Sequence, residues 1–330
     1  MRSIVFEKFG EPAEVLALRD VPVPEPGRGE VRVRMLAAPV NPSDLLSVRG
    51  QYARLPKLPA TPGFEGVGVV DAAGPGLLGR FLVGRRVAAL NSRTGSWAEF
   101  AVVAARQAVP LSRRLPVEQA AMFFVNPATA FILTRKVLAV PEGEWLLQTA
   151  AGSALGRMII RLGKRLGFKT INVVRRVEQV AELKAIGGDV VIADAGMNLR
   201  EQVRAATGGK GVRYAVDPVG GATGAAVVGC LAPGGRLILY GTLSNDPLPL
   251  SSRDLIASAA TIEGFWLGNW MARQNLIGKL RLVRILTGLI LEGVLTSRVG
   301  EVFPLKNVAD AVRTAEKVAR GGKVLLKIAD

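Results

Sequence analysis

Short apolar runs separated by glycine and proline dominate the first 125 residues. Residues 31–35 (Val-Arg-Val-Arg-Met) alternate apolar and polar side chains, the pattern of a strand with one buried face. Three further short apolar runs, at 67–72, 86–90 and 97–103, predict more strands, and Pro- and Gly-rich turns lie between them. This part of the chain therefore predicts a β-rich domain.

From about residue 127 the pattern changes to alternating strands and helices. A strand at 145–149 precedes a helix from Ala154, and a strand at 170–174 precedes a helix from Glu178. Further strands are predicted at 189–193, 213–217, 236–240 and 261–266. This alternation predicts right-handed crossovers and a doubly wound parallel sheet.

The end of the chain predicts a helix at 308–319 and a last strand at 323–328, which we expect to pack back on the first domain. The predicted fold is α/β in three segments. Residues 1–125 form a β-rich domain, 126–269 a doubly wound domain of the Rossmann type, and 270–330 return to the first domain, with a cleft between the two.

Composition excludes several kinds of catalysis. The 330 residues are too many for one core, and they include one cysteine and no histidine. A Ser-His-Asp triad, a Cys-His pair and the usual zinc or iron ligand sets are therefore excluded, and no metal is expected. Hydride chemistry on an organic cofactor needs none of these residues.

The net charge of +16 does not by itself indicate a nucleic-acid partner. The basic residues are scattered, and the cluster at 157–165 lies opposite apolar residues on a helical projection, as on a solvated face. Neither the N-terminus nor the apolar stretch 275–295, which charged residues interrupt, predicts an export signal or a membrane span. We expect a cytoplasmic protein without nucleic-acid or membrane partners.

A turn of small residues follows the strand at 145–149. Residues 150–156 (Ala-Ala-Gly-Ser-Ala-Leu-Gly) fit G-x-G-x-x-G in degenerate form, with Ala151, Ser153 and Gly156 at the glycine positions. Small residues let the backbone approach a pyrophosphate, whose charge is favoured at a helix N-terminus. Such turns are common before helices, but the position inside a strand-helix-strand unit favours a dinucleotide site.

The end of the next strand indicates which dinucleotide binds. An acidic residue there favours the ribose 2'-hydroxyl of NAD, whereas a cation accommodates the 2'-phosphate of NADP. Arg175 and Arg176 stand there, and Arg175 lies nineteen residues after Gly156. NADPH is therefore the predicted cofactor. The alternative is that Arg175 and Arg176 are ordinary surface residues without a role in cofactor binding.

Residues 239–243 and 264–267 follow later strands, and their aromatic side chains belong either to the core or to the cofactor site.

These motifs together resemble the zinc-free medium-chain dehydrogenases/reductases over the whole chain. The resemblance rests on segments 41–44 (Asn-Pro-Ser-Asp), 62–66 (Pro-Gly-Phe-Glu-Gly), 150–156, 217–221 (Asp-Pro-Val-Gly-Gly) and 239–241 (Leu-Tyr-Gly). It implies a GroES-like fold for the β-rich domain. The zinc-dependent members carry Cys and His where this chain has Ser43 and Phe64.

Within that family the chain looks most like the 2-enoyl thioester reductases. The supporting segments are 125–130, 170–175 and the Trp-rich segment 264–270, which quinone reductases usually lack. The resemblance implies that Tyr52 is the proton donor. It also implies an NADPH-binding set: Asn126, Thr129, Gly152, Ser153, Ala154, Leu155, Gly156, Arg175, Arg176, Val177, Tyr240, Gly241, Thr242, Leu243, Phe265, Trp266, Leu267 and Lys323. Gly152 departs from that branch, which usually carries Asn there.

The expected function is NADPH-dependent reduction of an activated carbon-carbon double bond, most simply in a trans-2-enoyl thioester of CoA or an acyl carrier protein. A quinone or enone reductase is the enzymatic alternative. A nucleotide- or RNA-binding protein on a dehydrogenase fold is the non-enzymatic one. Residues 261–266 predict an apolar edge strand, so we also expect a homodimer.

Overall fold

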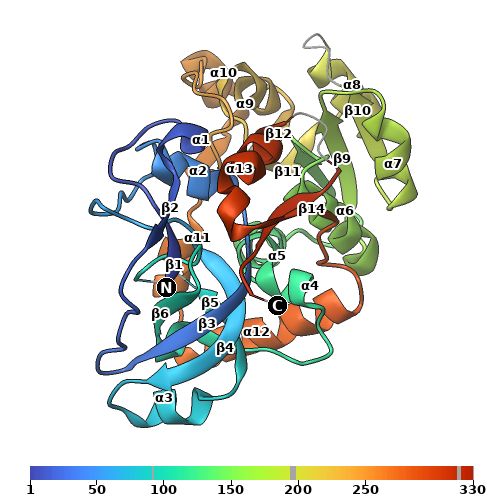
Figure 1. Ribbon diagram of the computed structural model, residues 1–330. Coiled ribbons are helices and arrows are strands. Elements are labelled where there is room, and N and C mark those ends of the chain that lie inside the picture. The colour runs from blue at the N-terminus through green and yellow to red at the C-terminus, as the bar shows by residue number, and fades with distance from the viewer. Residues whose placement is uncertain (91–92, 194–197, 318–320, 330) are drawn as a thin grey trace. The chain divides into compact units, whose positions relative to one another are not determined.

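The computed structural model describes residues 1–90, 93–193, 198–317 and 321–329. They form two compact units (Figure 1). The first unit is Met1–Val125 together with Thr296–Asp330, and the second is Asn126–Leu295. The expected α/β class, with a Rossmann-type unit and a β-rich unit, is confirmed.

The first unit is built on a mostly antiparallel sheet. Among the described residues its strands run in the order β14-β15-β3-β4-β5-β7, and β6 pairs with β3. A separate hairpin joins β1 to β2. The strands are β1 (Arg2–Val5), β2 (Ala17–Asp20), β3 (Glu30–Pro39), β4 (Glu65–Ala73), β5 (Arg86–Leu90), β6 (Phe100–Ala104), β7 (Ala108–Pro110), β14 (Val299–Pro304) and β15 (Lys323–Lys327). The helices are α1 (Pro12–Val15), α2 (Pro42–Val48), α3 (Leu77–Leu82), α4 (Val117–Ala121) and α13 (Val308–Glu316), with short turns η1 (Ala105–Gln107) and η3 (Leu305–Asn307).

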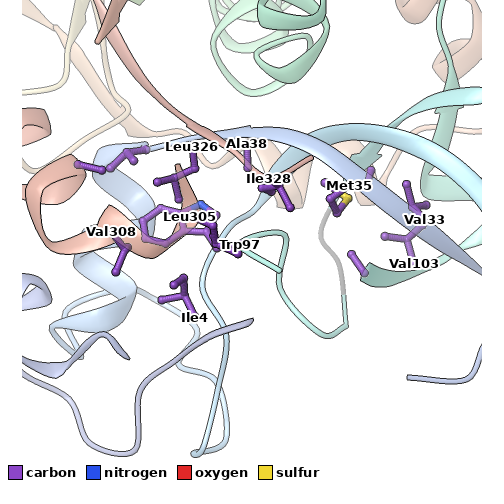
Figure 2. Packing of buried hydrophobic residues seen from close by; sticks show 14 of the residues in the cluster. Ile4, Val33, Met35, Ala38, Trp97, Val103, Leu305, Val308, Leu326 and Ile328 are labelled. Atoms are coloured by element: carbon purple, nitrogen blue, oxygen red, sulfur yellow. The ribbon is translucent and has the colours of Figure 1, made fainter. Parts of the chain in front are cut away.

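The core of this unit joins both ends of the chain (Figure 2). Leu326 of β15 pairs with Ala38 of β3, and both are fully buried. Trp97 is also fully buried, and its indole Nε1 donates to the carbonyl of Pro39 at 3.2 Å, which satisfies its one polar atom. The predicted return of the C-terminal segment to the first domain is therefore observed.

The second unit is a parallel sheet with crossover helices. The described strands lie in the order β10-β9-β8-β11-β12-β13, the doubly wound order of dinucleotide-binding domains. The strands are β8 (Trp145–Gln148), β9 (Lys169–Val174), β10 (Val190–Ala193), β11 (Val212–Asp217), β12 (Leu231–Leu239) and β13 (Thr261–Gly264). The helices are α5 (Val125–Ile132), α6 (Ala154–Leu166), α7 (Gln179–Ala185), α8 (Leu199–Ala206), α9 (Gly221–Val228), α10 (Ser252–Ser258), α11 (Leu267–Ala272) and α12 (Leu276–Leu291), with a π-helical turn η2 (Leu133–Val137) continuing α5.

Helix α6 shows how the sequence sets these elements. Ser153 caps its N-terminus, and Gly167 ends it in the left-handed conformation at φ 81°. Between them Met158, Ile159 and Leu162 are buried. The predicted start of this helix at Ala154 is confirmed.

The structure differs from the sequence prediction over residues 270–295. We expected them to return to the catalytic domain, but α12 belongs to the second unit. Arg161 of α6 donates to the Val294 carbonyl at 2.8 Å, and Arg165 of α6 pairs with Glu292. Buried leucines of α12, including Leu286, complete the attachment.

None of the described helices combines the length and apolarity that crossing a bilayer would require.

Candidate active site

The turn between β8 and α6 holds the start of the helix close to the end of the strand. The Ser153 hydroxyl accepts the Gly156 N–H at 3.0 Å, which satisfies one of the first helical amides. A side chain at Gly156 would place its Cβ 2.5 Å from the Ala151 carbonyl oxygen, so only glycine lets the helix start this close to the strand. The predicted residues Gly152, Ser153 and Ala154 lie at the surface of the turn, while Leu155 and Gly156 are buried beneath it.

Arg175 and Arg176 follow β9, whose neighbour in the sheet is β8. The carboxyl ends of parallel strands share one edge, so both arginines stand at the same edge as the turn. Arg175 is exposed and Arg176 half-buried, and no acidic side chain among the described residues pairs with either. Two such cations are suited to a phosphate group. Val177, next to them, is exposed.

A buried tyrosine hydroxyl lies at the end of β12. Tyr240 is partly exposed, yet its hydroxyl is buried and has no hydrogen-bond partner among the described residues. Burial and the nearby Asp217 carboxylate raise its pKa, so it stays protonated. Asp217 itself is buried and accepts from Thr149 and from the Gly220 N–H. An unsatisfied buried donor is costly, which favours a ligand contact at this position.

The remaining predicted cofactor residues of this unit lie on three segments. Gly241, Thr242 and Leu243 follow Tyr240, and a Cβ on Gly241 would stand 2.9 Å from the Pro218 carbonyl. Phe265, Trp266 and Leu267 follow β13 and are half-buried, so they do not belong to the hydrophobic core. Asn126 and Thr129 lie on α5, half-buried and buried respectively. The segments after β8, β9, β12 and β13 thus lie at the same end of the sheet, where the parallel strands have their carboxyl ends.

The residues of the second unit fit a dinucleotide. A bound phosphate-bearing cofactor at this end of the sheet would account for the arginines without an acidic partner and for the orphaned Tyr240 hydroxyl, and it would lie at the N-terminus of α6. Gly152–Gly156 would hold the pyrophosphate, and Arg175 and Arg176 a 2'-phosphate.

Mutation of the arginine pair tests the cofactor assignment. We expect the Arg175→Ala/Arg176→Ala variant to bind NADPH about ten- to a hundredfold more weakly, because a lost charge-assisted contact costs about 1.5–3 kcal/mol. NADH affinity should be unchanged, since NADH lacks the 2'-phosphate. Fluorescence titration measures both. Equal weakening for NADH and NADPH, or no weakening, would contradict the assignment.

The first unit contains a buried polar cluster, of which the sequence analysis assigned only Lys323 to the site. Asn41, Asp44, Glu65 and Lys323 are each at most 5% exposed. Asp44 accepts the Asn41 N–H at 2.8 Å and the Phe64 N–H at 3.0 Å. Burial raises the pKa of Asp44 to about 7, although these hydrogen bonds and the charge of Lys323 oppose the shift.

Glu65 fixes the chain just before α5. Its carboxylate accepts the Asn41 side-chain amide at 3.0 Å and the backbone N–H groups of Phe124 and Val125 at 3.1 and 2.9 Å. Burial raises the pKa of Glu65. Asn126 is the next residue along the chain, so Glu65 is a positioning residue for the start of α5. The motif 41–44 and the glutamate in 62–66 were the available sequence signals, but their burial could not be predicted.

Tyr52 lies beside this cluster. Its ring is 5.1 Å from that of Phe64, centroid to centroid, at an interplanar angle of 40°. Phe64 in turn donates its N–H to Asp44. Tyr52 is half-buried, so its ring is held by packing. Lys323, predicted to contact the cofactor, lies in the buried cluster at the start of β15, and its contact with the cofactor stays a prediction.

Within the described ranges, His, Cys, Asp and Glu side chains form no group of three or more that could hold a metal ion. The single cysteine, Cys230, is buried and its thiol donates to the Ala226 carbonyl.

The sheet order and the small-residue turn are those of a dinucleotide-binding protein. Family models identify it further: residues 27–113 match the alcohol dehydrogenase GroES-like domain and residues 154–281 the zinc-binding dehydrogenase family. The mitochondrial enoyl-(acyl-carrier-protein) reductase of Rattus norvegicus is 32% identical over 321 residues, 96% of this chain and 86% of that protein. The enzyme of that name from Xenopus tropicalis is 33% identical over 326 residues, 96% and 92% of the two chains.

Solved structures agree on the fold. The Escherichia coli quinone oxidoreductase in complex with NADPH superimposes with a TM-score of 0.92 at 27% identity, over 99% of this chain and 100% of that one. The chain belongs to the medium-chain dehydrogenase/reductase family of oxidoreductases, which confirms the resemblance found in the sequence.

Proposed function

We propose that this protein is an NADPH-dependent reductase of the carbon-carbon double bond of 2-enoyl thioesters. The observation that carries the substrate class is Tyr52, a half-buried phenol held against Phe64. The NADPH requirement is supported by the unpaired Arg175 and Arg176 and by the NADPH complex of the quinone oxidoreductase. The names of the rat and frog relatives agree with the enoyl reductase assignment.

The proposed chemistry divides between cofactor and protein. Bound NADPH supplies a hydride to the β-carbon of the enoyl thioester. The protein must then stabilise the developing enolate on its oxygen and deliver a proton to the α-carbon. A phenol, with an ordinary pKa of about 10, is protonated at neutral pH and is a competent donor. Tyr52 is assigned that proton.

A quinone reductase is the second candidate function. The Escherichia coli quinone oxidoreductase favours it, because the NADPH complex of that enzyme superimposes on 99% of this chain. Quinone reduction requires no protonation at carbon, so it would leave Tyr52 without a chemical role.

NADPH oxidation assays with a panel of acceptors test the proposal. We expect the highest kcat/KM with trans-2-enoyl-CoA substrates, and much lower values with quinones and simple enones. A chain that oxidises NADPH with quinones but leaves every enoyl thioester unreduced would contradict the enoyl reductase proposal and support the second candidate.

We also propose that the protein is a homodimer paired through β13. This strand is the last of the described sheet and pairs on one side with β12. It contains no Pro, Lys or Arg, and its one charged residue, Glu263, is already paired with Arg236 of β12. Unprotected edges of this kind are usually covered, and a twofold axis would pair β13 with its own copy. Sedimentation at micromolar concentration is expected to show a dimer, and a monomer would contradict the proposal.

The cytoplasmic location stays a prediction; the named relatives are mitochondrial.

A further inference from the structure

An exposed apolar face lies on the surface of the first unit. We call it the α3 patch; it consists of Leu77, Leu78, Phe81 and Val83. Leu77 and Phe81 are each 75% exposed, Leu78 is 53% and Val83 47% exposed. Helix α3 buries only Gly79 and Leu82, so its largest side chains point away from the core that anchors it. Leu77 and Phe81 are one helical turn apart and form a continuous apolar surface.

Arginines surround the α3 patch. The turn η1 contacts α3, the chain at Gly29 lies beside Gly76, and the start of β5 follows α3 directly. These segments, together with the residues after β7, bring exposed cations to this end of the unit: Arg28, Arg80, Arg85, Arg106, Arg113 and Arg114. No acidic side chain of the described residues pairs with any of them.

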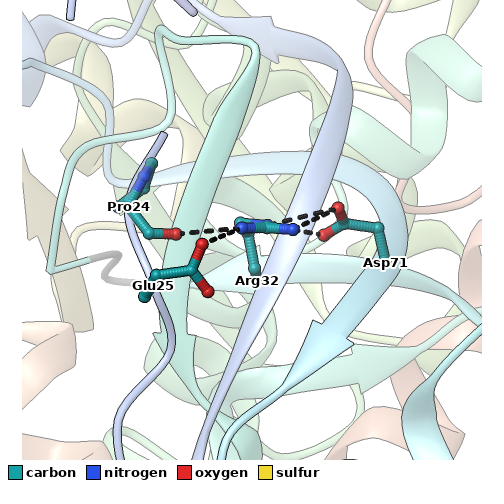
Figure 3. A network of polar contacts seen from close by, with 4 residues as sticks. All are labelled: Pro24, Glu25, Arg32 and Asp71. Atoms are coloured by element: carbon teal, nitrogen blue, oxygen red, sulfur yellow. Dashed lines mark hydrogen bonds and ion pairs between the residues drawn. The ribbon is translucent and has the colours of Figure 1, made fainter. Parts of the chain in front are cut away.

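The acidic residues at the same end are already paired. Arg32 binds Glu25 at 2.9 Å and Asp71 at 3.1 Å (Figure 3). Glu30 pairs with Arg93 at 3.0 Å. The six exposed arginines therefore leave a net positive potential around the apolar side chains.

The patch is remote from the candidate active site of its own unit. Strand β4 starts at Glu65 of the buried cluster and ends at Ala73, close to α3. Its nine residues at about 3.3 Å each separate the patch from Glu65 by roughly 26 Å. The patch is thus not a wall of the proposed catalytic site.

We propose that the α3 patch docks the protein on a membrane surface that contains anionic phospholipid. Such a surface offers hydrocarbon for Leu77 and Phe81 and phosphate groups for the surrounding arginines, at adjacent depths. A second copy of the chain fits less well, because a twofold contact would place arginines against arginines. Docking of this kind needs no membrane-spanning segment, but it departs from the sequence prediction that the protein has no membrane partner.

Vesicle sedimentation of the full chain tests the proposal. We expect binding to vesicles of phosphatidylcholine mixed with phosphatidylglycerol, weak binding to pure phosphatidylcholine, and release by high salt. The Leu77→Ser/Phe81→Ser variant should bind at least about tenfold more weakly, since both apolar contacts are lost. The Arg80→Gln/Arg85→Gln variant should bind the mixed vesicles about 25-fold more weakly, at about fivefold per arginine.

The matched control is Leu276→Ser/Ile277→Ser on α12, where the side chains are similarly exposed. It should bind vesicles like the wild type, and all variants should keep the wild-type Tm. Failure of the wild type to bind anionic vesicles would overturn the proposal, as would equal binding by the α3 variants. So would a smaller oligomer in Leu77→Ser/Phe81→Ser than in the wild type, because the patch would then join copies of the chain.

Discussion

Replacing Tyr52 by phenylalanine is expected to lower kcat for a 2-enoyl thioester by about two orders of magnitude or more, because general acids typically contribute about 10² to 10⁴ in rate. The substitution keeps the ring against Phe64 and removes only the hydroxyl. NADPH affinity and Tm should therefore be nearly unchanged. Steady-state kinetics with one enoyl-CoA measures the loss.

Quinone reduction by the same variant supplies the control. Because that reaction needs no proton at carbon, its rate should fall far less than the rate with the enoyl thioester. If Tyr52→Phe reduces the enoyl thioester at the wild-type rate, Tyr52 has no part in the mechanism. Equal losses with both acceptors would indicate a packing role beside Phe64.

Stability is expected to fall as pH rises from about 4 to about 7. Burial raises the pKa of Asp44 to about 7 and also raises the pKa of Glu65, so above about pH 4 the folded chain binds more protons than the unfolded chain. Their contribution is fully present below about pH 4 and is lost as pH passes the folded values. For Asp44, the difference between about 7 and the ordinary 3.8 corresponds to about 4 kcal/mol.

Urea unfolding at a series of pH values measures this effect. The chain has no histidine, so no other side chain with an ordinary pKa titrates between pH 5 and 7. Asp44→Asn removes one titrating group and should flatten the curve, whatever it costs in absolute stability. Stability that rises across this range, or a slope unchanged in Asp44→Asn, would show that the two carboxyl groups do not govern it.

The alternation of strands and helices was sufficient to predict the cofactor domain. Local signals set its parts: Ser153 caps α6, and a run of apolar residues forms β9. Arg175 and Arg176 could be placed because their position follows from the end of that strand. The sequence predicts these parts of the domain because each depends on residues close to it in the chain.

Long-range packing limited the rest. Helix α12 was assigned to the wrong unit, because its attachment depends on contacts such as Arg161 to the Val294 carbonyl, 133 positions apart. Apart from Lys323, the polar cluster was missed for the same reason. Glutamate and lysine are usually exposed to solvent. Glu65 and Lys323 come together in the interior of the first unit only when its sheet has folded.

Transfer of deuterium tests the central claim most directly. The enzyme is supplied with a trans-2-enoyl-CoA and NADPH that carries deuterium at both C4 positions, in ordinary water. We expect a saturated acyl-CoA with one deuterium at carbon 3 and none at carbon 2, as mass spectrometry and NMR would show. Recovery of the unsaturated thioester, or a saturated product without deuterium at carbon 3, would contradict the assignment of this protein as an NADPH-dependent enoyl thioester reductase.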